Sequence, residues 1–231
     1  MREHVRLVIA IDGPAASGKS STAKWVADRL AIHHVDSGAL YRALTAAVLA
    51  GEPSPGRWAE PAVLGHASRV SLEPAGRSFA PLIDGQPAGE RIRSPEVTAH
   101  VSTVAAMPGV RAWVNERVRA AADRYDVVVD GRDMGTAVFP EAPLKIFLVA
   151  DPWERARRRL IQRLERAPSD EEVAEETDRL VQRDARDATQ TVPARDAVVV
   201  DTTYLTQEEQ VERIVALARA VTHRGDVTSG G

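Results

Sequence analysis

Cysteine is absent from the 231 residues of the chain. Its absence excludes disulfides, thiolate metal sites and cysteine nucleophiles, and it is typical of proteins of the reducing cytosol. Long apolar runs are missing too. The first apolar stretch, Val5 to Ile11, is shorter than the core of a signal peptide, and no later stretch approaches the roughly 18 apolar residues of a membrane span. We therefore expect a cytoplasmic protein with no membrane partner.

Lysine is scarce as well. Only Lys19, Lys24 and Lys145 are lysines among the 30 basic residues, which leaves 27 arginines. Two explanations stay open: a codon bias of the genome, or selection for the bidentate contacts that a guanidinium makes with phosphate. The net charge of -3 argues against a general basic surface, so we expect no nucleic-acid partner. The length allows one substantial core, and we expect a monomer.

The apolar segments alternate between strand-like and helical spacing. Arg6 to Asp12 has the pattern of a buried strand, and Ser20 to Leu30 carries apolar residues at helical spacing. A second strand and a second helix follow, which is the opening of a parallel α/β sheet. The expected central strands are Arg6 to Asp12, Ile32 to Asp36, Val127 to Val129, Ile146 to Val149 and Ala197 to Val200. They predict an α/β fold with a central parallel five-stranded sheet flanked by helices.

The pattern changes between the second and the third of these strands. Glu52 to Pro61 is rich in proline and glycine, and strand-like pieces follow at Val70 to Glu73 and at Phe79 to Asp84. Ser94-Pro95-Glu96 then predicts a helix start, with a capping hydroxyl, proline at the first helical position and early negative charge. We expect residues 65–107 to form a small β-containing insert, and residues 1–64 and 108–231 to form the core.

A glycine-rich turn lies between the first strand and the first helix. Residues 13–20 read GPAASGKS, which fits the pattern G-x-x-x-x-G-K-[ST] in its required context. Backbone N–H groups of such a loop surround phosphate oxygens, Lys19 would reach the β and γ phosphates, and Ser20 would hold Mg²⁺. We therefore expect ATP as the nucleotide and Mg²⁺ as the cofactor. The expected cofactor-binding residues are Gly13, Pro14, Ala15, Ala16, Ser17, Gly18, Lys19, Ser20 and Ser21.

This loop also occurs in GTPase switches, which carry an N-K-x-D base reader. The only asparagine here is Asn115, and Glu116 follows it. A guanine-specific switch is therefore disfavoured.

Two arginine-containing turns follow two of the predicted strands. One is Asp36 to Arg42, with the sequence DSGALYR, and the other is Asp130 to Thr136, with the sequence DGRDMGT. Because the carboxyl ends of parallel strands meet at one sheet edge, Arg42 and Arg132 would form opposite walls of one phosphate pocket. Plainer alternatives are a capped helix start with a solvated arginine for the first turn, and a turn with a salt bridge for the second.

Arginine is concentrated further along the chain, around an acidic, hinge-like stretch from Pro168 to Glu176. The nine arginines are Arg155, Arg157, Arg158, Arg159, Arg163, Arg166, Arg179, Arg183 and Arg186. Such a segment, about 155–190, is typical of a mobile lid that closes over ATP and brings guanidinium groups to the transferred phosphoryl. For most of these residues the alternative, a solvated helical hairpin with Glu/Arg pairs, is favoured.

Six segments together resemble the bacterial cytidylate kinases, a family of P-loop nucleoside monophosphate kinases. The segments are IDGPAASGKSST, DSGALYR, IRSPEV followed by VSTVAAMPGVR, DGRDMGTAVFP, KIFL and VVVDTT, and the resemblance runs from about Val8 to Val221. It implies a P-loop kinase core, a monophosphate-binding insert, a helical lid, and transfer of the γ-phosphoryl group of ATP to CMP or dCMP.

The resemblance also implies roles for single residues. It places Arg155 and Arg158 where the family's lid begins, and we expect the catalytic residues to be Lys19, Arg132, Arg155 and Arg158. The implied substrate-binding residues are Ser37, Tyr41, Arg42, Ser102, Arg111, Arg132, Asp133, Arg183 and Asp187. Among them, Ser102, Arg111 and Asp133 would read the cytosine edge, which offers both hydrogen-bond donors and acceptors.

The chain departs from the family pattern at Gln190, where family members carry an arginine. Either Arg186 or Arg195 would have to substitute for it, or Gln190 would give a weaker, neutral contact.

No catalytic base is expected, because the acceptor phosphate has a second pKa of about 6 and is already anionic at neutral pH. The alternatives are a kinase of UMP, AMP or another small acceptor, and a non-catalytic nucleotide-dependent switch.

Overall fold

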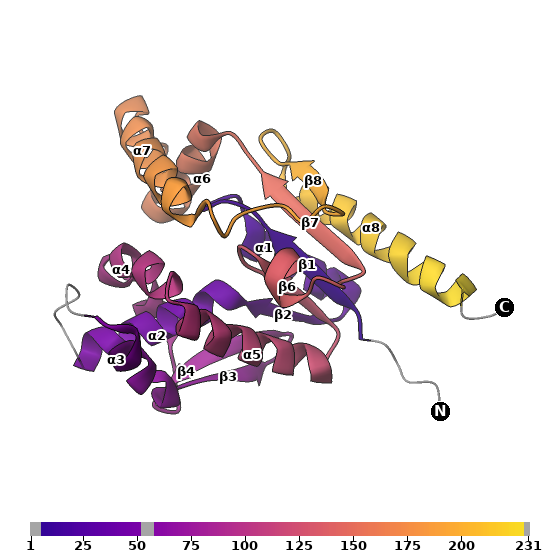
Figure 1. Cartoon of the computed structure of the whole chain (residues 1–231). Coiled ribbons are helices and arrows are strands. Elements are labelled where there is room, and N and C mark those ends of the chain that lie inside the picture. Colours follow the sequence, from indigo (N-terminus) through magenta and orange to yellow (C-terminus); the bar gives the residue numbers. More distant parts are fainter. Residues whose placement is uncertain (1–5, 52–57, 229–231) are drawn as a thin grey trace. The chain divides into compact units, whose positions relative to one another are not determined.

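The computed structural model describes residues 6–51 and 58–228 of the chain, so part of the predicted Glu52 to Pro61 segment lies outside the described residues (Figure 1). The chain divides into two compact units. The first holds Ile32–Val127, and the second holds Leu7–Ala31 together with the chain from Val128 onward. The first unit is larger than the insert expected at 65–107, because it also contains residues 32–64 and 108–127, which the sequence analysis assigned to the core.

The second unit is built on strands that neighbour one another in the order β6-β1-β7-β8. β7 pairs with β1 and with β8 in parallel, in registers that place Asp12 opposite Phe147 and Val149 opposite Asp201. The strand bounds are β1 Val8–Asp12, β6 Val127–Asp130, β7 Leu144–Val149 and β8 Val198–Asp201. β8 stands at one end of this order, and Val199 is 55% exposed. The sequence analysis interpreted the apolar run of this strand as a sign of a central position. That interpretation is wrong, because β8 lies at the edge.

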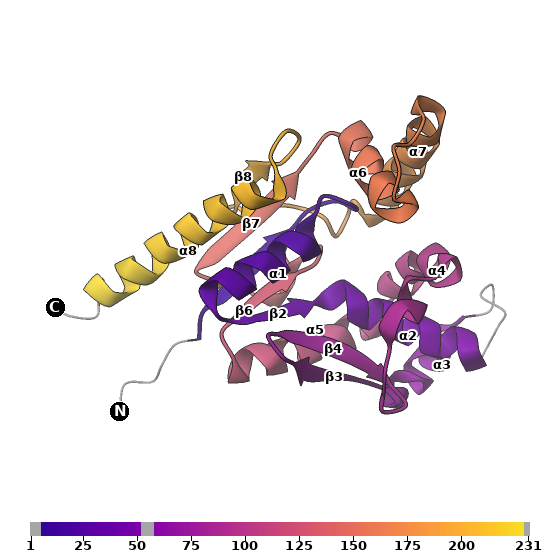
Figure 2. The ribbon, with the colours of Figure 1, turned by 180° about the vertical axis from the view of Figure 1, so that it is seen from behind.

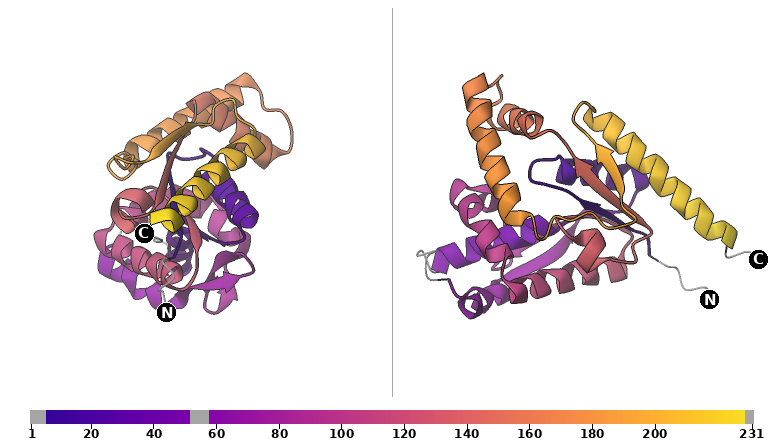
Figure 3. Two further views of the ribbon diagram at one scale, coloured as in Figure 1. Left: turned by 90° about the vertical axis from the view of Figure 1, so that its right-hand side faces the viewer. Right: turned by 45° about the horizontal axis from the view of Figure 1, so that its top comes forward.

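Within the described residues, this unit holds the short π-helix Met134–Val138 and four α-helices. Their bounds are α1 Lys19–Leu30, α6 Pro152–Leu164, α7 Asp170–Asp187 and α8 Gln207–Thr228. α1 packs against α8, which also contacts β7 (Figure 2). α6 and α7 pack on each other as a hairpin (Figure 3). The two residues that predicted the start of α8 form its expected capping box, since the carboxylate of Glu209 accepts from the backbone N–H of Thr206 and the Thr206 hydroxyl accepts from that of Glu209.

The first unit carries the predicted fifth parallel strand. β2 (His33–Asp36) pairs in parallel with β4 (Ser78–Ile83), and β4 pairs in antiparallel register with β3 (Val70–Ala75) and β5 (Gln86–Pro87). The strand-like pieces of the expected insert thus form strands that extend from β2. The helices of this unit are α2 Ser37–Gly51, α3 Glu60–Gly65, α4 Pro95–Ala105 and α5 Pro108–Arg124. α2 packs against both α4 and α5.

Local chemistry explains most helix starts. The hydroxyl of Ser94 accepts a hydrogen bond from the backbone N–H of Val97, as the sequence predicted for α4.

The predicted hinge from Pro168 to Glu176 is wrong beyond its first two residues. Ser169 and Glu172 form a capping box there, and acidic residues occupy the first turn, so α7 begins at Asp170 and the acidic stretch is helical.

Within the described ranges 6–51 and 58–228, no helix has the length and apolar character needed to cross a membrane.

Candidate functional site

The glycine-rich loop of the second unit runs from the end of β1 to the start of α1. Gly13 has a φ of +149°, and a Cβ at this position would collide with the carbonyl oxygen of Leu148 on the neighbouring strand. Gly18 takes a left-handed φ of +85° immediately before the helix. Only glycine meets both requirements, so the motif glycines are explained by backbone geometry. The loop consequently presents its backbone at the N-terminus of α1, where positive helix potential favours anions.

Lys19 is buried inside this loop. Its Nζ donates to the carbonyl oxygen of Pro14 at 2.5 Å and to the hydroxyl of Ser17 at 3.3 Å. Burial lowers the pKa of the Lys19 ammonium well below its usual 10.5, and the nearby Arg132 acts in the same direction. An anionic ligand would offset both effects, because negative charge stabilises the protonated amine. The side chain is therefore suited to phosphate.

Ser20 points to a carboxylate that the sequence analysis did not assign to the site. The Ser20 hydroxyl donates to Oδ2 of Asp130, at the end of β6, over 2.6 Å. A hydroxyl beside a carboxylate supplies the oxygen ligands that Mg²⁺ prefers, so the residues present fit this ion. The sequence did contain the signal, since Asp130 ends an uninterrupted apolar run, as a ligand-binding residue of a parallel strand often does.

Asp12 is a second carboxylate that the sequence analysis left out. It ends β1 and accepts hydrogen bonds from the backbone N–H groups of Met134 at 2.8 Å and Gly135 at 2.7 Å. Burial raises the pKa of the Asp12 carboxyl from 3.8 to about 6, against the lowering effect of these two N–H groups. Asp12 thereby fastens the DGRDMGT turn to the strand that precedes the phosphate loop.

Three of the predicted substrate-binding residues meet in this unit. The Nε of Arg132 donates to Oδ2 of Asp187 at 3.3 Å, and the Nε of Arg183 lies 3.8 Å from the same oxygen. Asp133, next to Arg132, is buried with 7% of its surface exposed. The DGRDMGT turn and the C-terminal end of α7 therefore present two guanidinium groups around one carboxylate.

The other predicted substrate-binding residues lie in the first unit. Ser37 and Tyr41 are buried on α2, and Arg42 from the same helix donates to the hydroxyl of Thr98 on α4 at 3.0 Å. Ser102 lies on α4. Arg111 on α5 donates to the carbonyl oxygen of Ala105 at 3.3 Å. Since Arg42 and Arg132 belong to different units, their shared phosphate pocket stays a prediction.

The two arginines expected to act from the lid are held by backbone groups. Arg155 is 4% exposed, and its guanidinium binds the carbonyl oxygens of Ala150 and Ala15 as well as the carboxylate of Asp184. Arg158 donates to the carbonyl oxygens of Thr202 and Thr203. Their described contacts therefore brace the phosphate loop and the turn after β8, and a catalytic role for either stays a prediction.

Most other arginines of the α6–α7 hairpin pair with glutamates, as the alternative interpretation had it. Arg166 pairs with Glu172, and the carboxylate of Glu176, whose side chain is 3% exposed, takes three arginines. Those three are Arg159, Arg163 and Arg179. The hydroxyl of Ser21 lies 2.9 Å from the carbonyl oxygen of Gly18 and 3.1 Å from the side-chain oxygen of Gln207 on α8.

Comparison with known proteins assigns the chain to a family. The family model described as cytidylate kinase matches residues 9–220. The chain belongs to the cytidylate kinase family. A relative named cytidylate kinase from Thermus thermophilus is 42% identical over 215 residues, which cover 93% of this chain and 100% of the relative. Another from Geobacillus kaustophilus is 45% identical and covers 92% of this chain and 96% of its own length.

One solved structure that resembles this cytidylate kinase family member in fold is a gluconokinase from Sinorhizobium meliloti 1021. It is 16% identical, with a TM-score of 0.48, and covers 98% of this chain and 99% of its own. At this level of similarity it bears on no conclusion about the site.

Proposed function

We propose that the chain is a cytidylate kinase that transfers the γ-phosphoryl group of ATP to CMP or dCMP, giving ADP and CDP or dCDP. The observation that carries this proposal is the family match over residues 9–220, which contains a complete phosphate loop with a buried lysine. The reaction belongs to pyrimidine nucleotide metabolism.

The donor nucleotide would bind at the phosphate loop of the second unit. Its phosphate oxygens would accept hydrogen bonds from the N–H groups at the start of α1 and from the ammonium of Lys19, which already lies inside the loop. The expected contributors are Gly13, Pro14, Ala15, Ala16, Ser17, Gly18, Lys19, Ser20 and Ser21. The short Ser20–Asp130 contact supports a Mg²⁺ site at these two residues. When bound, the ion would neutralise phosphate charge at the loop.

The acceptor nucleotide would bind through the residues that the resemblance to the cytidylate kinases implies. Ser37, Arg42 and Arg132 would hold its phosphate, with Tyr41 beside it, and Arg183 and Asp187 would approach phosphate and ribose. The carboxylate of Asp133, the guanidinium of Arg111 and the hydroxyl of Ser102 complement the donors and acceptors of the cytosine edge. Residues 65–107 would serve as the monophosphate-binding insert. The described meeting of Arg132 and Arg183 at Asp187 supports this part of the proposal.

The chain's own residues would act by positioning and by charge. An acceptor phosphate is anionic at neutral pH, so no side chain has to remove a proton from it. Lys19 would stabilise the charge on the transferred group, and Arg132 would hold the acceptor in line with it. Additional stabilisation by Arg155 or Arg158 would require either guanidinium to leave its present backbone partners.

A panel of acceptors tests the proposal. Protein, ATP and Mg²⁺ are incubated with CMP, dCMP, UMP or AMP, and ADP release is measured for each. We expect release with CMP or dCMP to exceed that with AMP or UMP. Faster release with UMP or AMP would point to the alternative, a different monophosphate kinase, and ATP binding without acceptor-dependent ADP release would point to a nucleotide-dependent switch.

A cytoplasmic location, a monomeric state and the absence of nucleic-acid and membrane partners stay predictions from the sequence.

A further inference from the structure

The phosphate loop is hydrogen-bonded to the α6–α7 hairpin through Ala15. The backbone N–H of Ala15 donates to Oδ1 of Asp184 on α7 at 2.9 Å, and the carbonyl oxygen of Ala15 accepts from Nη1 of Arg155 on α6 at 2.7 Å. The same Nη1 donates to Oδ2 of Asp184 at 2.7 Å. The three groups close a ring, because one nitrogen of a guanidinium carries two hydrogens and can serve two acceptors.

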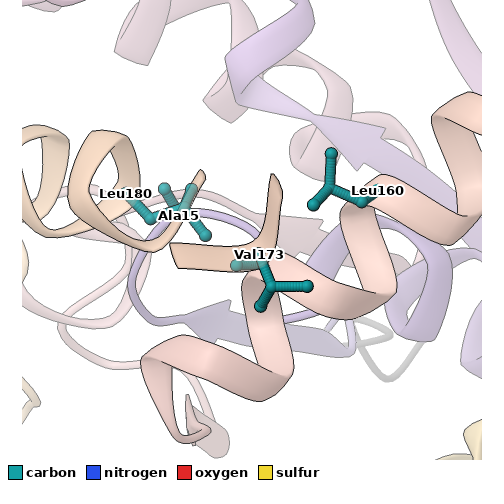
Figure 4. Packing of buried hydrophobic residues seen from close by; sticks show 5 residues of the cluster. Ala15, Leu160, Val173 and Leu180 are labelled. Atoms are coloured by element: carbon teal, nitrogen blue, oxygen red, sulfur yellow. The ribbon is translucent and has the colours of Figure 1, made fainter. Parts of the chain in front are cut away.

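The same contact has an apolar side. Ala15 shares a buried cluster with Ala156 and Leu160 of α6 and with Val173 and Leu180 of α7 (Figure 4). Ala16 and Leu164 pack against this cluster. Both the polar atoms and the methyl group of Ala15 are therefore held by the hairpin. A movement of the hairpin must either carry this loop residue along or break the ring.

The contribution of this ring to the stability of the fold does not explain its presence. Arg155 is 4% exposed, and a buried ion pair contributes little net stability compared with apolar side chains of similar size, because both charges lose their hydration. What the pair does provide is direction: each backbone polar atom of Ala15 has one charged partner at a fixed place. Ala15 lies within the loop that, in the proposed function, surrounds the donor phosphates.

We infer that Asp184 and Arg155 are positioning residues, which fix the backbone of Ala15 and thereby set the phosphate loop for the donor nucleotide. In this role Arg155 acts through the loop, because its guanidinium binds Ala150, Ala15 and Asp184. The inference rests on the proposed function, since it concerns the same donor site. It extends that function by naming Asp184, which no part of the sequence analysis assigned.

The test is the variant Asp184→Asn, compared with Glu175→Gln as a matched control. Both substitutions replace a carboxylate on α7 by an amide of the same size. Glu175, with a side chain 70% exposed, pairs only with Arg179 at 3.1 Å among the described interactions, so its change leaves the ring intact. In Asp184→Asn one of the two oxygens becomes an NH₂ group, which faces a donor and cannot accept from it.

Steady-state kinetics and ATP binding separate positioning from a simple charge effect. We expect the KM and the Kd for ATP to rise about tenfold in Asp184→Asn, the factor that corresponds to the loss of one charge-assisted hydrogen bond. The KM for CMP should change less than about twofold, and Glu175→Gln should match the wild type. If the pair were only a local charge, removing the carboxylate would leave Arg155 uncompensated and would tighten ATP binding. Unchanged or tighter ATP binding in Asp184→Asn therefore overturns the inference.

Two further measurements keep the outcome clear. If Asp184→Asn does not fold, Arg155→Lys, which keeps the charge but loses the planar fork, should give the same selective rise in the KM for ATP. Amide hydrogen exchange at Ala15 should be faster in either variant than in Glu175→Gln, and equal exchange rates would contradict the ring. A wild type that forms no CDP would instead refute the proposed function, which keeps the two failures distinct.

Discussion

Lys19 is a single residue whose placement favours ligand binding at the expense of the stability of the folded state. Its ammonium is buried among the carbonyl oxygen of Pro14 and the hydroxyl of Ser17, and burial lowers its pKa. A charge held under such conditions weakens the folded state, because the unfolded chain hydrates it fully. The arrangement makes sense only with an anion, which supports a phosphate-binding role for this lysine.

We expect Lys19→Ala to fold as stably as the wild type, or more stably, and to lose turnover by at least about 10³-fold, since it removes the charge nearest to the transferred phosphoryl. Thermal melting and the rate of ADP release with CMP measure the two effects. Lys24→Ala on the exposed side of the same helix is the control and should keep full activity. Substantial turnover by Lys19→Ala would remove Lys19 from the mechanism.

Asp12 gives the stability of the protein a pH dependence of known sign. Burial raises its pKa from 3.8 to about 6, so the folded state holds the proton more tightly than the unfolded state does. Its contribution is most favourable below pH 3.8, decreases as pH rises through the interval between the two pKa values, and is constant above about pH 6. At neutral pH the ionised carboxylate costs about 3 kcal/mol relative to its protonated form.

Urea unfolding at a series of pH values, for the wild type and for Asp12→Asn, measures this contribution. The stability of the wild type relative to the variant should fall by about 3 kcal/mol between about pH 3 and pH 7, with most of the fall below about pH 6. A flat or rising difference would mean that Asp12 is not a buried carboxyl with a raised pKa. At neutral pH the ionised carboxylate accepts hydrogen bonds from the backbone N–H groups of Met134 and Gly135. These bonds hold the turn that carries Arg132.

The helices α6 and α7 are joined by a cluster of ion pairs around one buried glutamate. Glu176 of α7 is buried, and guanidinium groups from both helices surround its carboxylate. These arginines are between 31% and 61% exposed, so without Glu176 they could turn toward water. The expected loss is therefore smaller than for a fully buried pair.

We expect Glu176→Ala to lower the free energy of unfolding by about 1–3 kcal/mol, through the lost ion pairs and the space left between the helices. Glu175→Ala, the neighbouring exposed residue, should cost less than about 1 kcal/mol. Chemical unfolding of both variants compares them directly. Equal losses would show that the buried carboxylate does not hold the hairpin together.

The hairpin also shows what the sequence could and could not predict about elements. Arginine content indicated the segment, and the glutamates indicated ion pairs, but the buried convergence on Glu176 depends on which faces of the two helices meet. The hinge predicted from acidic composition was wrong because Ser169 and Glu172 cap a helix there. Composition alone does not separate a charged linker from the first turn of a helix.

At the scale of the whole molecule, the periodic patterns predicted the five parallel-type strands and their order along the chain. They did not predict that the strands of the expected insert extend from β2, since strand pairing between distant segments is not written in local periodicity. The phosphate loop was predictable because its glycines and lysine have a fixed spacing. Asp12 and Asp184 were not assigned, because their roles depend on the backbone groups that the fold brings beside them. Asp130 was not assigned either, although its place at the end of an apolar run was a signal in the sequence.

The proposed reaction of the molecule is the transfer of a phosphoryl group from ATP to a cytidine monophosphate. The most direct measurement follows the label of γ-labelled ATP, in the presence of Mg²⁺ and CMP, into products separated by chromatography. The label should appear in the β-phosphate of CDP, with one ADP formed for each CDP. Label recovered only in inorganic phosphate, or no labelled CDP where a parallel reaction with UMP or AMP does give a labelled diphosphate, would contradict this function.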